Sequence, residues 1–414
     1  MNKKVADIKK KNYPNNKKTR KMYVRRTLQK YASFSIKSCT YNFLRRYNVL
    51  AIETSCDDTC VSIVNTEGEI LVDLKKSLKT VEEDGGIIPT KAHIHHQVEI
   101  GDLARKALED ANVSLSKDIE FIACTRGPGM PGSLGIGYDF AKGLSVASGK
   151  PLIGVHHMLG HLLMPTMFDS SITFPNYSML CSGGHTVLVY SENLYTHNII
   201  VDTLDIAIGD SLDKCGRELG LKSNMIGKEM EKYINDEFIA KGRVDDAQEI
   251  NQLTKKYPIT EPLKYNLKQH PKFVSFSFSG YLSNLKKIIQ DNDKVDKPGL
   301  CYLIQEHHFK HLINKINDAR KYKMLPRENV PLILSGGVGS NLRLRAKLEH
   351  EVSSIFSSFH FPPVRMCTDN AVMIGWAGIK LYDTLKLKTN YNTSPIRKWP
   401  LDELLTVDGW AKVE

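Results

Sequence analysis

Residues 48–64 read NVLAIETSCDDTCVSIV, and this stretch decides the fold. Two apolar runs, 49–52 and 61–64, flank a polar turn at 55–59, so the stretch predicts two strands joined by a tight turn. Further elements are predicted after these two strands: a third strand at 70–72, a helix around 100–111 and a strand at 119–124. A glycine-rich loop at 126–133 then leads into a further helix.

The same order of elements recurs downstream. It comprises strands at 177–181, 187–190 and 199–203, a glycine turn at 182–186, a strand at 330–334, the glycine loop 335–341 and a helix at 342–348. We therefore expect a duplicated α/β fold with two lobes. The expected lobes are 47–165, completed by 370–405, and 166–369, with a mostly helical insertion at about 205–325. Glycine turns let backbone N–H groups approach a phosphate, so a nucleotide cleft is expected between the lobes.

Charge is distributed very unevenly along the 414 residues. Residues 1–46 contain fifteen Lys and Arg against Asp7 alone, which leaves 42 basic and 45 acidic side chains for the rest of the chain. A basic, hydroxylated and acid-poor N-terminus is typical of a mitochondrial presequence. A disordered basic tail that helps bind nucleic acid is the alternative.

Composition and cysteine usage narrow the class of protein. The chain is 41% hydrophobic and 25% charged, which is ordinary for a globular protein. No apolar run reaches the roughly 18 residues of a membrane span, so no membrane contact is expected. The eight cysteines are dispersed without a C-x-x-C pair, which favours a reducing compartment. The phosphate-binding motif G-x-x-x-x-G-K-[ST] is absent, and no G-x-G-x-x-G opens the first predicted helix, which disfavours a dinucleotide-binding fold.

A histidine pair at 157 and 161 is the main candidate for metal binding. Residues four apart share one face of a helix, so His157 and His161 can point imidazoles at one ion, with Asp369 as a candidate third ligand. Met158 stands where a zinc protease has its catalytic glutamate, which disfavours a protease. On spacing alone, a histidine pair that merely decorates a helix surface remains open. His93, His95 and His96 are expected to be solvated and predict no second site.

Seven motifs in fixed order carry a resemblance to one family. They are ETSCDDT at 53–59, GGIIP at 85–89, HMLGH at 157–161, SGGHT at 182–186, SFSFSG at 275–280, SGGV at 335–338 and CTDN at 367–370. The series resembles the tRNA N6-adenosine threonylcarbamoyltransferase family, and the N-terminus together with residues 89–96 is similar to its yeast mitochondrial representative. The resemblance covers about residues 48–400. It implies a two-lobe fold of the actin, Hsp70 and sugar-kinase (ASKHA) type.

The resemblance also implies the chemistry. Such enzymes transfer a threonylcarbamoyl group from threonylcarbamoyl-AMP to N6 of adenosine 37 in tRNAs that read ANN codons, here in the mitochondrial matrix. It implies one divalent metal, zinc or iron, per subunit of a homodimer, with His157, His161 and Asp369 as ligands and Asp57 as the catalytic carboxylate. The substrate-binding residues that it implies are Cys181, Ser182, Gly183, Gly184, His185, Asp213, Gly227, Glu231, Ser335, Gly336 and Asn341.

An alternative hypothesis assigns the chain to a different class of protein. An actin-like or Hsp70-like module could bind a nucleotide and protein partners without transferring any group. Glycine loops serve both functions, but a nucleotide-dependent scaffold has no use for the two histidines and Asp369. These three residues therefore favour the enzyme.

Overall fold

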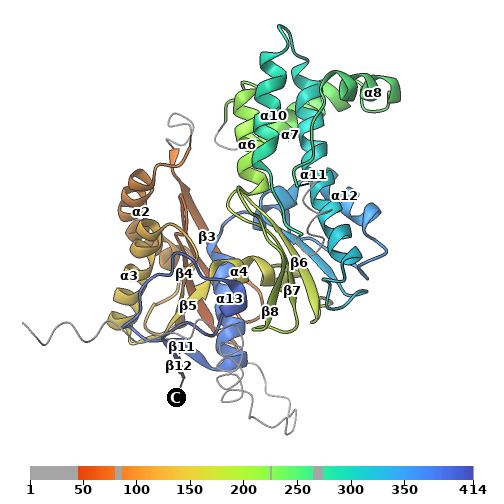
Figure 1. Ribbon diagram of the computed structural model, residues 1–414. Helices are drawn as coiled ribbons and strands as arrows, with labels where there is room; N and C mark the ends of the chain where they lie inside the picture. The colour runs from red at the N-terminus through yellow and green to blue at the C-terminus, as the bar shows by residue number, and fades with distance from the viewer. Residues whose placement is uncertain (1–44, 80–85, 224–225, 264–273, 414) are drawn as a thin grey trace, which may run out of the picture. The chain divides into compact units, whose positions relative to one another are not determined.

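The computed structural model describes residues 45–79, 86–223, 226–263 and 274–413. The predicted presequence or basic tail at 1–46 lies almost entirely outside the described residues. Within the described part, two five-stranded sheets and their helices form the body of the chain (Figure 1).

The first sheet has the strand order β3-β2-β1-β4-β5. Strand β1 pairs antiparallel with β2 and parallel with β4; β2 also pairs antiparallel with β3, and β4 pairs parallel with β5. Its strands are β1 (Asn48–Glu53), β2 (Asp58–Asn65), β3 (Ile70–Ser77), β4 (Ile119–Gly127) and β5 (Leu152–His156).

The second sheet repeats this topology strand for strand. Read from its other edge, the order is β8-β7-β6-β9-β10, with antiparallel pairs β7–β8 and β6–β7 and parallel pairs β6–β9 and β9–β10. Its strands are β6 (Asn176–Cys181), β7 (Thr186–Ser191), β8 (His197–Val201), β9 (Leu332–Ser335) and β10 (Phe359–His360). The duplication and the α/β fold class predicted from the sequence are confirmed.

Helices cover both faces of the first sheet, which explains why its central strand is an unbroken apolar run. Val49 and Ala51 face one hydrophobic cluster, whereas Leu50 and Ile52 face another, and all four are fully buried. One face packs against α2 (Pro89–Asp110) and α3 (Pro131–Ser148); the other packs against α13 (Ala371–Leu385), as Figure 1 shows. The helix α4 (His157–Leu163) packs on α13 and is followed by the short α5 (Pro165–Phe168).

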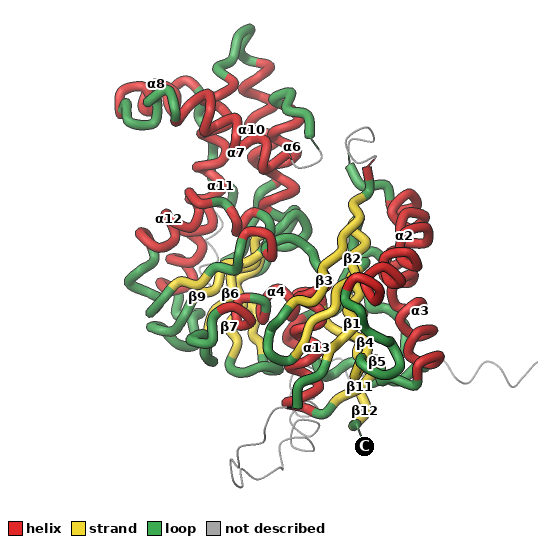
Figure 2. The backbone as a smooth tube through the Cα atoms, turned by 180° about the vertical axis from the view of Figure 1, so that it is seen from behind, coloured by secondary structure: helices red, strands yellow, loops and turns green. Residues whose placement is uncertain are grey.

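The long insertion between β8 and β9 is mostly helical, and Figure 2 shows these helices gathered at one end of the second sheet. Buried Phe276, Phe278, Tyr281 and Phe309 belong to one cluster with the core of that sheet. The elements are α6 (Ile208–Glu218), α7 (Ile226–Ile234), the π-helix η2 (Asn235–Ile239), α8 (Ala247–Lys256), α10 (Ser279–Gln290) and α11 (Lys297–Lys321).

The remaining elements complete the glycine loop of the second sheet and the C-terminus. They are η3 (Val338–Ser340), α12 (Leu342–Glu351), η4 (Val364–Met366), η5 (Leu401–Glu403) and the small sheet of β11 (Leu387–Thr389) and β12 (Trp410–Lys412). Among the helices of the described ranges, none is long and apolar enough to cross a membrane.

The structure corrects the expectation for the histidines at 93–96. Helix α2 begins at Pro89, well before the predicted start, so these histidines lie within it. His96 is fully buried: Nδ1 lies 2.7 Å from Thr59 Oγ1 and Nε2 lies 3.0 Å from the Cys56 carbonyl oxygen. The prediction that it is solvated is wrong, because the helix turns this side chain onto β2 and the turn that precedes it.

Candidate metal centre

Helix α4 brings the two predicted metal-ligating histidines together. It starts directly after β5, and the His156 side chain caps it by accepting a hydrogen bond from the Met158 backbone N–H at 3.1 Å. His157 and His161 are therefore one turn apart on the same face, and both are buried at 4% exposure.

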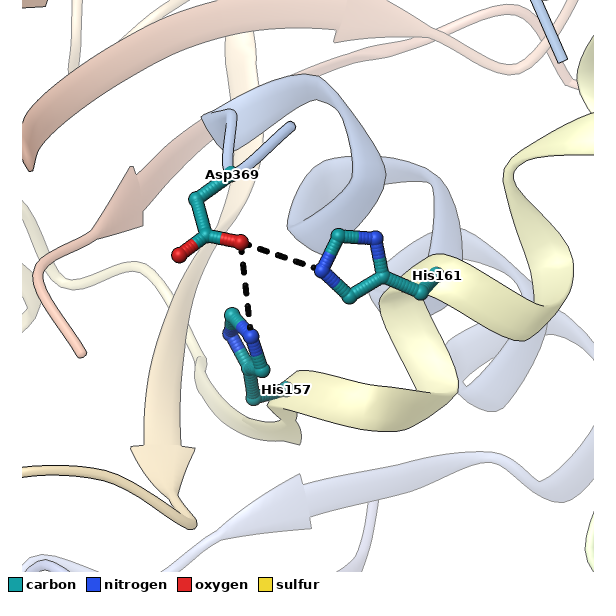
Figure 3. Close-up of side chains that lie close together, drawn as sticks. All are labelled: His157, His161 and Asp369. Atoms are coloured by element: carbon teal, nitrogen blue, oxygen red, sulfur yellow. Dashed lines mark hydrogen bonds and ion pairs between the residues drawn. The ribbon is translucent and has the colours of Figure 1, made fainter. Parts of the chain in front are cut away.

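Asp369 comes from a distant part of the sequence to face both imidazoles. It lies just before α13, whose first turn is capped by the side chain of Asn370. Its Oδ1 atom lies 3.1 Å from His161 Nε2 and 3.6 Å from His157 Nε2, as Figure 3 shows. One ligand atom from each of the three residues lies within 4.8 Å of the others.

The donor set fits a divalent metal ion. Two imidazole nitrogens and one carboxylate oxygen converge, and this set suits zinc, iron or manganese while leaving coordination positions open. In the metal-free protein, the carboxylate of Asp369 also balances the positive charge of His157. Burial lowers the pKa of His157, but the carboxylates of Glu53 and Asp369 outweigh burial and raise this pKa to about 9. Burial raises the pKa of Asp369, but His157 and His161 hold it well below its usual range.

Glu53 completes this site, and the sequence reasoning gave it no role. It ends β1, is 1% exposed, and places Oε2 3.3 Å from His157 Nδ1 on the side opposite Asp369. Burial raises its pKa, but the facing imidazole of His157 has the larger combined effect and lowers it. A signal was available, because an acidic residue closes an otherwise apolar buried strand.

The glycine turn after β6 lies next to the histidines. His185 packs its ring 5.9 Å from the ring of His157. Burial, followed by the nearby charge of His157, lowers the pKa of His185 to about 4, so His185 is neutral at pH 7. The Ser182 hydroxyl accepts hydrogen bonds from the N–H groups of Gly184 at 3.3 Å and of His185 at 3.0 Å. The turn thus points two backbone donors at one oxygen, while Gly183, which precedes both donors, is open on its side-chain face.

Four of the predicted substrate-binding residues form two contacting pairs. The Gly227 N–H donates to Asp213 Oδ1 at 2.8 Å, which joins the start of α7 to α6. Glu231, one turn further along α7, hydrogen-bonds with the side chain of Asn341. Burial is the main cause of the raised pKa of both Asp213 and Glu231.

Three other predicted binding residues are packed or hydrogen-bonded within the protein. The Cys181 side chain is fully buried in the core of the second sheet. Ser335 Oγ donates to the His161 carbonyl oxygen at 3.2 Å, so it helps to hold α4. Gly336, at φ +93°, passes so close to Cys181 that a Cβ atom would lie 2.3 Å from its carbonyl oxygen.

Asp57, the predicted catalytic carboxylate, lies in the turn between β1 and β2. Burial, then the neighbouring Asp58, raises its pKa, and the charge of Asp369 adds to this shift. Asp58 is itself ion-paired with Lys75. A carboxyl whose pKa is moved towards neutrality is better matched to proton transfer at pH 7.

Comparisons with known proteins show which family the chain belongs to. Residues 69–376 match the profile of the family described as "tRNA N6-adenosine threonylcarbamoyltransferase". The mitochondrial enzyme of that name from Schizosaccharomyces pombe is 37% identical over 404 residues, covering 93% of this chain and 94% of the relative. The Borreliella afzelii enzyme is 33% identical, covering 84% and 92%. Component A of the Acidaminococcus fermentans (R)-2-hydroxyglutaryl-CoA dehydratase has a TM-score of 0.47 at 14% identity, covering 81% and 97%.

The two-lobe fold and these family matches together define a transferase. The chain belongs to the tRNA N6-adenosine threonylcarbamoyltransferase family, as the sequence motifs predicted.

Proposed function

We propose that the chain transfers the threonylcarbamoyl group of threonylcarbamoyl-AMP to N6 of adenosine 37 in tRNAs that read ANN codons. The observation that carries this proposal is the convergence of His157, His161 and Asp369 beside the backbone donors of the 182–185 turn. A metal ion at these ligands would supply Lewis acidity to an activated carbonyl oxygen.

The 182–185 turn is proposed to receive the phosphate and acyl oxygens of the adenylate. In the structure, the Ser182 hydroxyl occupies the acceptor position for the N–H groups of Gly184 and His185. We propose that a ligand oxygen takes this acceptor position. Neutral His185 adds a donor or acceptor, and it brings no second cation beside His157.

The nucleoside is proposed to lie along α7. Asp213, Gly227, Glu231 and Asn341 form a row of carboxylates and amides that suits ribose hydroxyls and adenine nitrogens. The backbone of Cys181, Ser335 and Gly336 would form the floor between this row and the metal ligands, since Gly336 lies against Cys181 and Ser335 against His161.

Asp57 is proposed to accept the proton that leaves N6 as the new C–N bond forms. An aryl amine is a weak nucleophile, so removal of its proton during attack lowers the barrier. The bond between the carbonyl carbon and the AMP phosphate oxygen then breaks, and AMP leaves with both bonding electrons.

The direct test incubates the purified full chain with threonylcarbamoyl-AMP, a divalent metal and unmodified tRNA. Mass spectrometry of the digested tRNA should show threonylcarbamoyl-adenosine at position 37 in tRNAs that read ANN codons. The matched control is a tRNA whose adenosine 37 is replaced by guanosine. Hydrolysis of the adenylate without tRNA modification would contradict the proposed transfer.

Location, metal and assembly are further parts of the proposal. We propose a mitochondrial matrix enzyme, because the N-terminus is basic and acid-poor and a mitochondrial relative matches across 93% of the chain.

We propose that the metal is zinc or iron and that the chain forms a homodimer in solution. Exposed apolar side chains of α2, Ile94 at 58% and Val98 at 68%, offer a surface for the second copy. Light scattering of wild type and Val98→Glu tests the dimer.

A further inference from the structure

The two proposed metal-ligating histidines differ in the contacts of Nδ1, the ring nitrogen that does not face Asp369. His157 has Glu53 Oε2 at 3.3 Å and Ser55 Oγ at 3.2 Å from its Nδ1 atom. His161 Nδ1, in contrast, is buried without a hydrogen-bond partner within the described ranges. The Nδ1 side of the His157 ring is therefore fixed by hydrogen-bond partners. The described polar contact of the His161 ring is the one between Nε2 and Asp369.

Glu53 is itself fixed by three different parts of the chain. Oε1 accepts the backbone N–H of Ser55 at 2.6 Å, and Oε2 accepts the hydroxyl of Thr125 at the end of β4. His157, at the start of α4, is its third partner. A carboxylate that is 1% exposed and anchored in this way has little freedom to rotate.

A carboxylate behind a histidine determines which ring nitrogen carries the proton. With Nδ1–H donating to Glu53, a bound metal would replace the other ring proton, and the lone pair would then lie on Nε2, the atom that faces Asp369. Histidine ligands of metals are commonly oriented in this way, and the negative charge behind the ring makes the ligating nitrogen more basic.

We propose that Glu53 is a positioning residue of the metal centre, which fixes the tautomer and orientation of His157 so that Nε2 points at the bound ion. The inference rests on the metal centre proposed above. The first motif, ETSCDDT, would then have two functions: Glu53 orients a metal ligand, and Asp57, four residues further on, is the proposed proton acceptor.

The test measures binding of Co²⁺ and Zn²⁺ to the full chain, without any substrate. Co²⁺ reports its coordination through its visible absorption, and Zn²⁺ affinity follows from competition with a chelating dye. Glu53→Gln keeps the size of the side chain but removes the charge that selects the tautomer. We expect about 10- to 100-fold weaker binding and an altered Co²⁺ spectrum.

The matched control is Glu261→Gln. Glu261 is also a partly buried carboxylate that faces a buried histidine, His311, with Oε1 3.4 Å from Nδ1, but it lies in the helical insertion. Its loss is expected to leave the Co²⁺ spectrum and both affinities unchanged. Thermal unfolding in chelator compares the stability of the two metal-free variants.

Glu53→Asp serves as the second variant where Glu53→Gln does not fold. It keeps the charge but withdraws the carboxylate from His157 by one methylene, so weaker binding is again expected. Wild-type affinity and spectrum in a folded Glu53 variant would overturn the inference, and so would an equal loss in Glu261→Gln. A wild-type chain that binds neither ion would overturn the metal centre itself.

Discussion

At the scale of single residues, the site has a charge balance that makes its two histidines unequal. His157 lies between two carboxylates, Glu53 and Asp369, whereas His161 contacts Asp369 alone among the described carboxylates. Removing His157 therefore leaves the buried Glu53 without its cationic partner. Removing His161 takes away a ligand but creates no unpaired buried charge.

We accordingly predict that both His157→Ala and His161→Ala lose the metal, but that their stabilities differ. In chelator, His157→Ala should lower the free energy of unfolding by about 3 kcal/mol, because a buried ion pair is broken from one side. His161→Ala should cost about 1–2 kcal/mol. Urea unfolding and metal analysis check both variants. Equal destabilisation would contradict the role assigned to Glu53 as partner of His157.

For Asp57, the prediction concerns rate rather than binding. Asp57→Asn removes one charge and one proton acceptor at almost constant volume, so transfer should slow by a factor on the order of 10²–10⁴. Affinity for the adenylate should stay within a factor of about three. Single-turnover kinetics with saturating tRNA separate the two effects.

The matched control is Asp58→Asn, which removes the same charge one residue away from a carboxylate already paired with Lys75. We expect a loss of less than about tenfold. An unchanged rate in Asp57→Asn would leave Asp57 as a turn residue only.

At the scale of elements, one of the two glycine loops of the second sheet depends on close approach to a neighbouring strand. Gly336 has φ +93°, and a Cβ atom there would lie 2.3 Å from the carbonyl oxygen of Cys181. Gly183 lies in the other loop, where a Cβ atom would meet nothing within 4 Å. Steric contact and a positive φ therefore require glycine at position 336, whereas neither is seen at position 183.

Gly336→Ala should lower the free energy of unfolding by about 2–3 kcal/mol, through steric overlap with β6 and a strained backbone. Gly183→Ala should change it by less than about 0.5 kcal/mol. Urea denaturation of both variants in chelator makes the comparison. Similar stability of the two variants would show that β9 can move away from β6 at little cost.

The helical insertion contains a carboxylate whose ionisation stabilises the fold. Burial alone would raise the pKa of Glu261, but the facing His311 imidazole and a hydrogen bond from Asn314 outweigh burial and lower the pKa to about 2. Its unfolded value is about 4.3. Because the folded pKa is the lower one, the stabilisation is complete above about pH 5 and is lost as pH falls towards 2.

Glu261→Gln should therefore destabilise the chain by up to about 2–3 kcal/mol at pH 7. The difference from wild type should shrink steadily between pH 5 and pH 3. Urea unfolding at several pH values measures it. A difference that stays constant over this range would mean that packing, and not charge, is what Glu261 contributes.

The outcome for individual elements shows what the sequence could predict. Strands β1 and β2 follow from apolar runs that any buried strand requires, and the second sheet repeats them, so the topology was predictable. The start of α2 was not, because its first turns contain His93, His95 and His96 in place of apolar residues. Their burial depends on contacts with β2 and the preceding turn, which are distant in sequence.

For the metal site, too, some residues could be predicted from the sequence and others could not. The spacing of His157 and His161 could be interpreted from helix periodicity alone. Asp369 was only a candidate third ligand until the family resemblance supported it, because more than 200 residues separate it from His161. Glu53 was missed, since its partner His157 lies 104 residues away and only the folded chain brings the two together.

At the scale of the whole molecule, the central claim is that one metal ion at His157, His161 and Asp369 is required for threonylcarbamoyl transfer. The ligands come from α4 and from the residue before the cap of α13, and the proposed substrate loops come from β6, β7 and β9. Transfer therefore depends on elements from most of the described chain.

The most direct measurement removes the metal with chelator and then titrates Zn²⁺ or Fe²⁺ back while transfer to tRNA is followed. We predict no transfer by the metal-free chain, recovery that is complete at one equivalent per chain, and no recovery in His161→Ala. Full transfer by the metal-free chain, or recovery in His161→Ala equal to that of wild type, would contradict the claim.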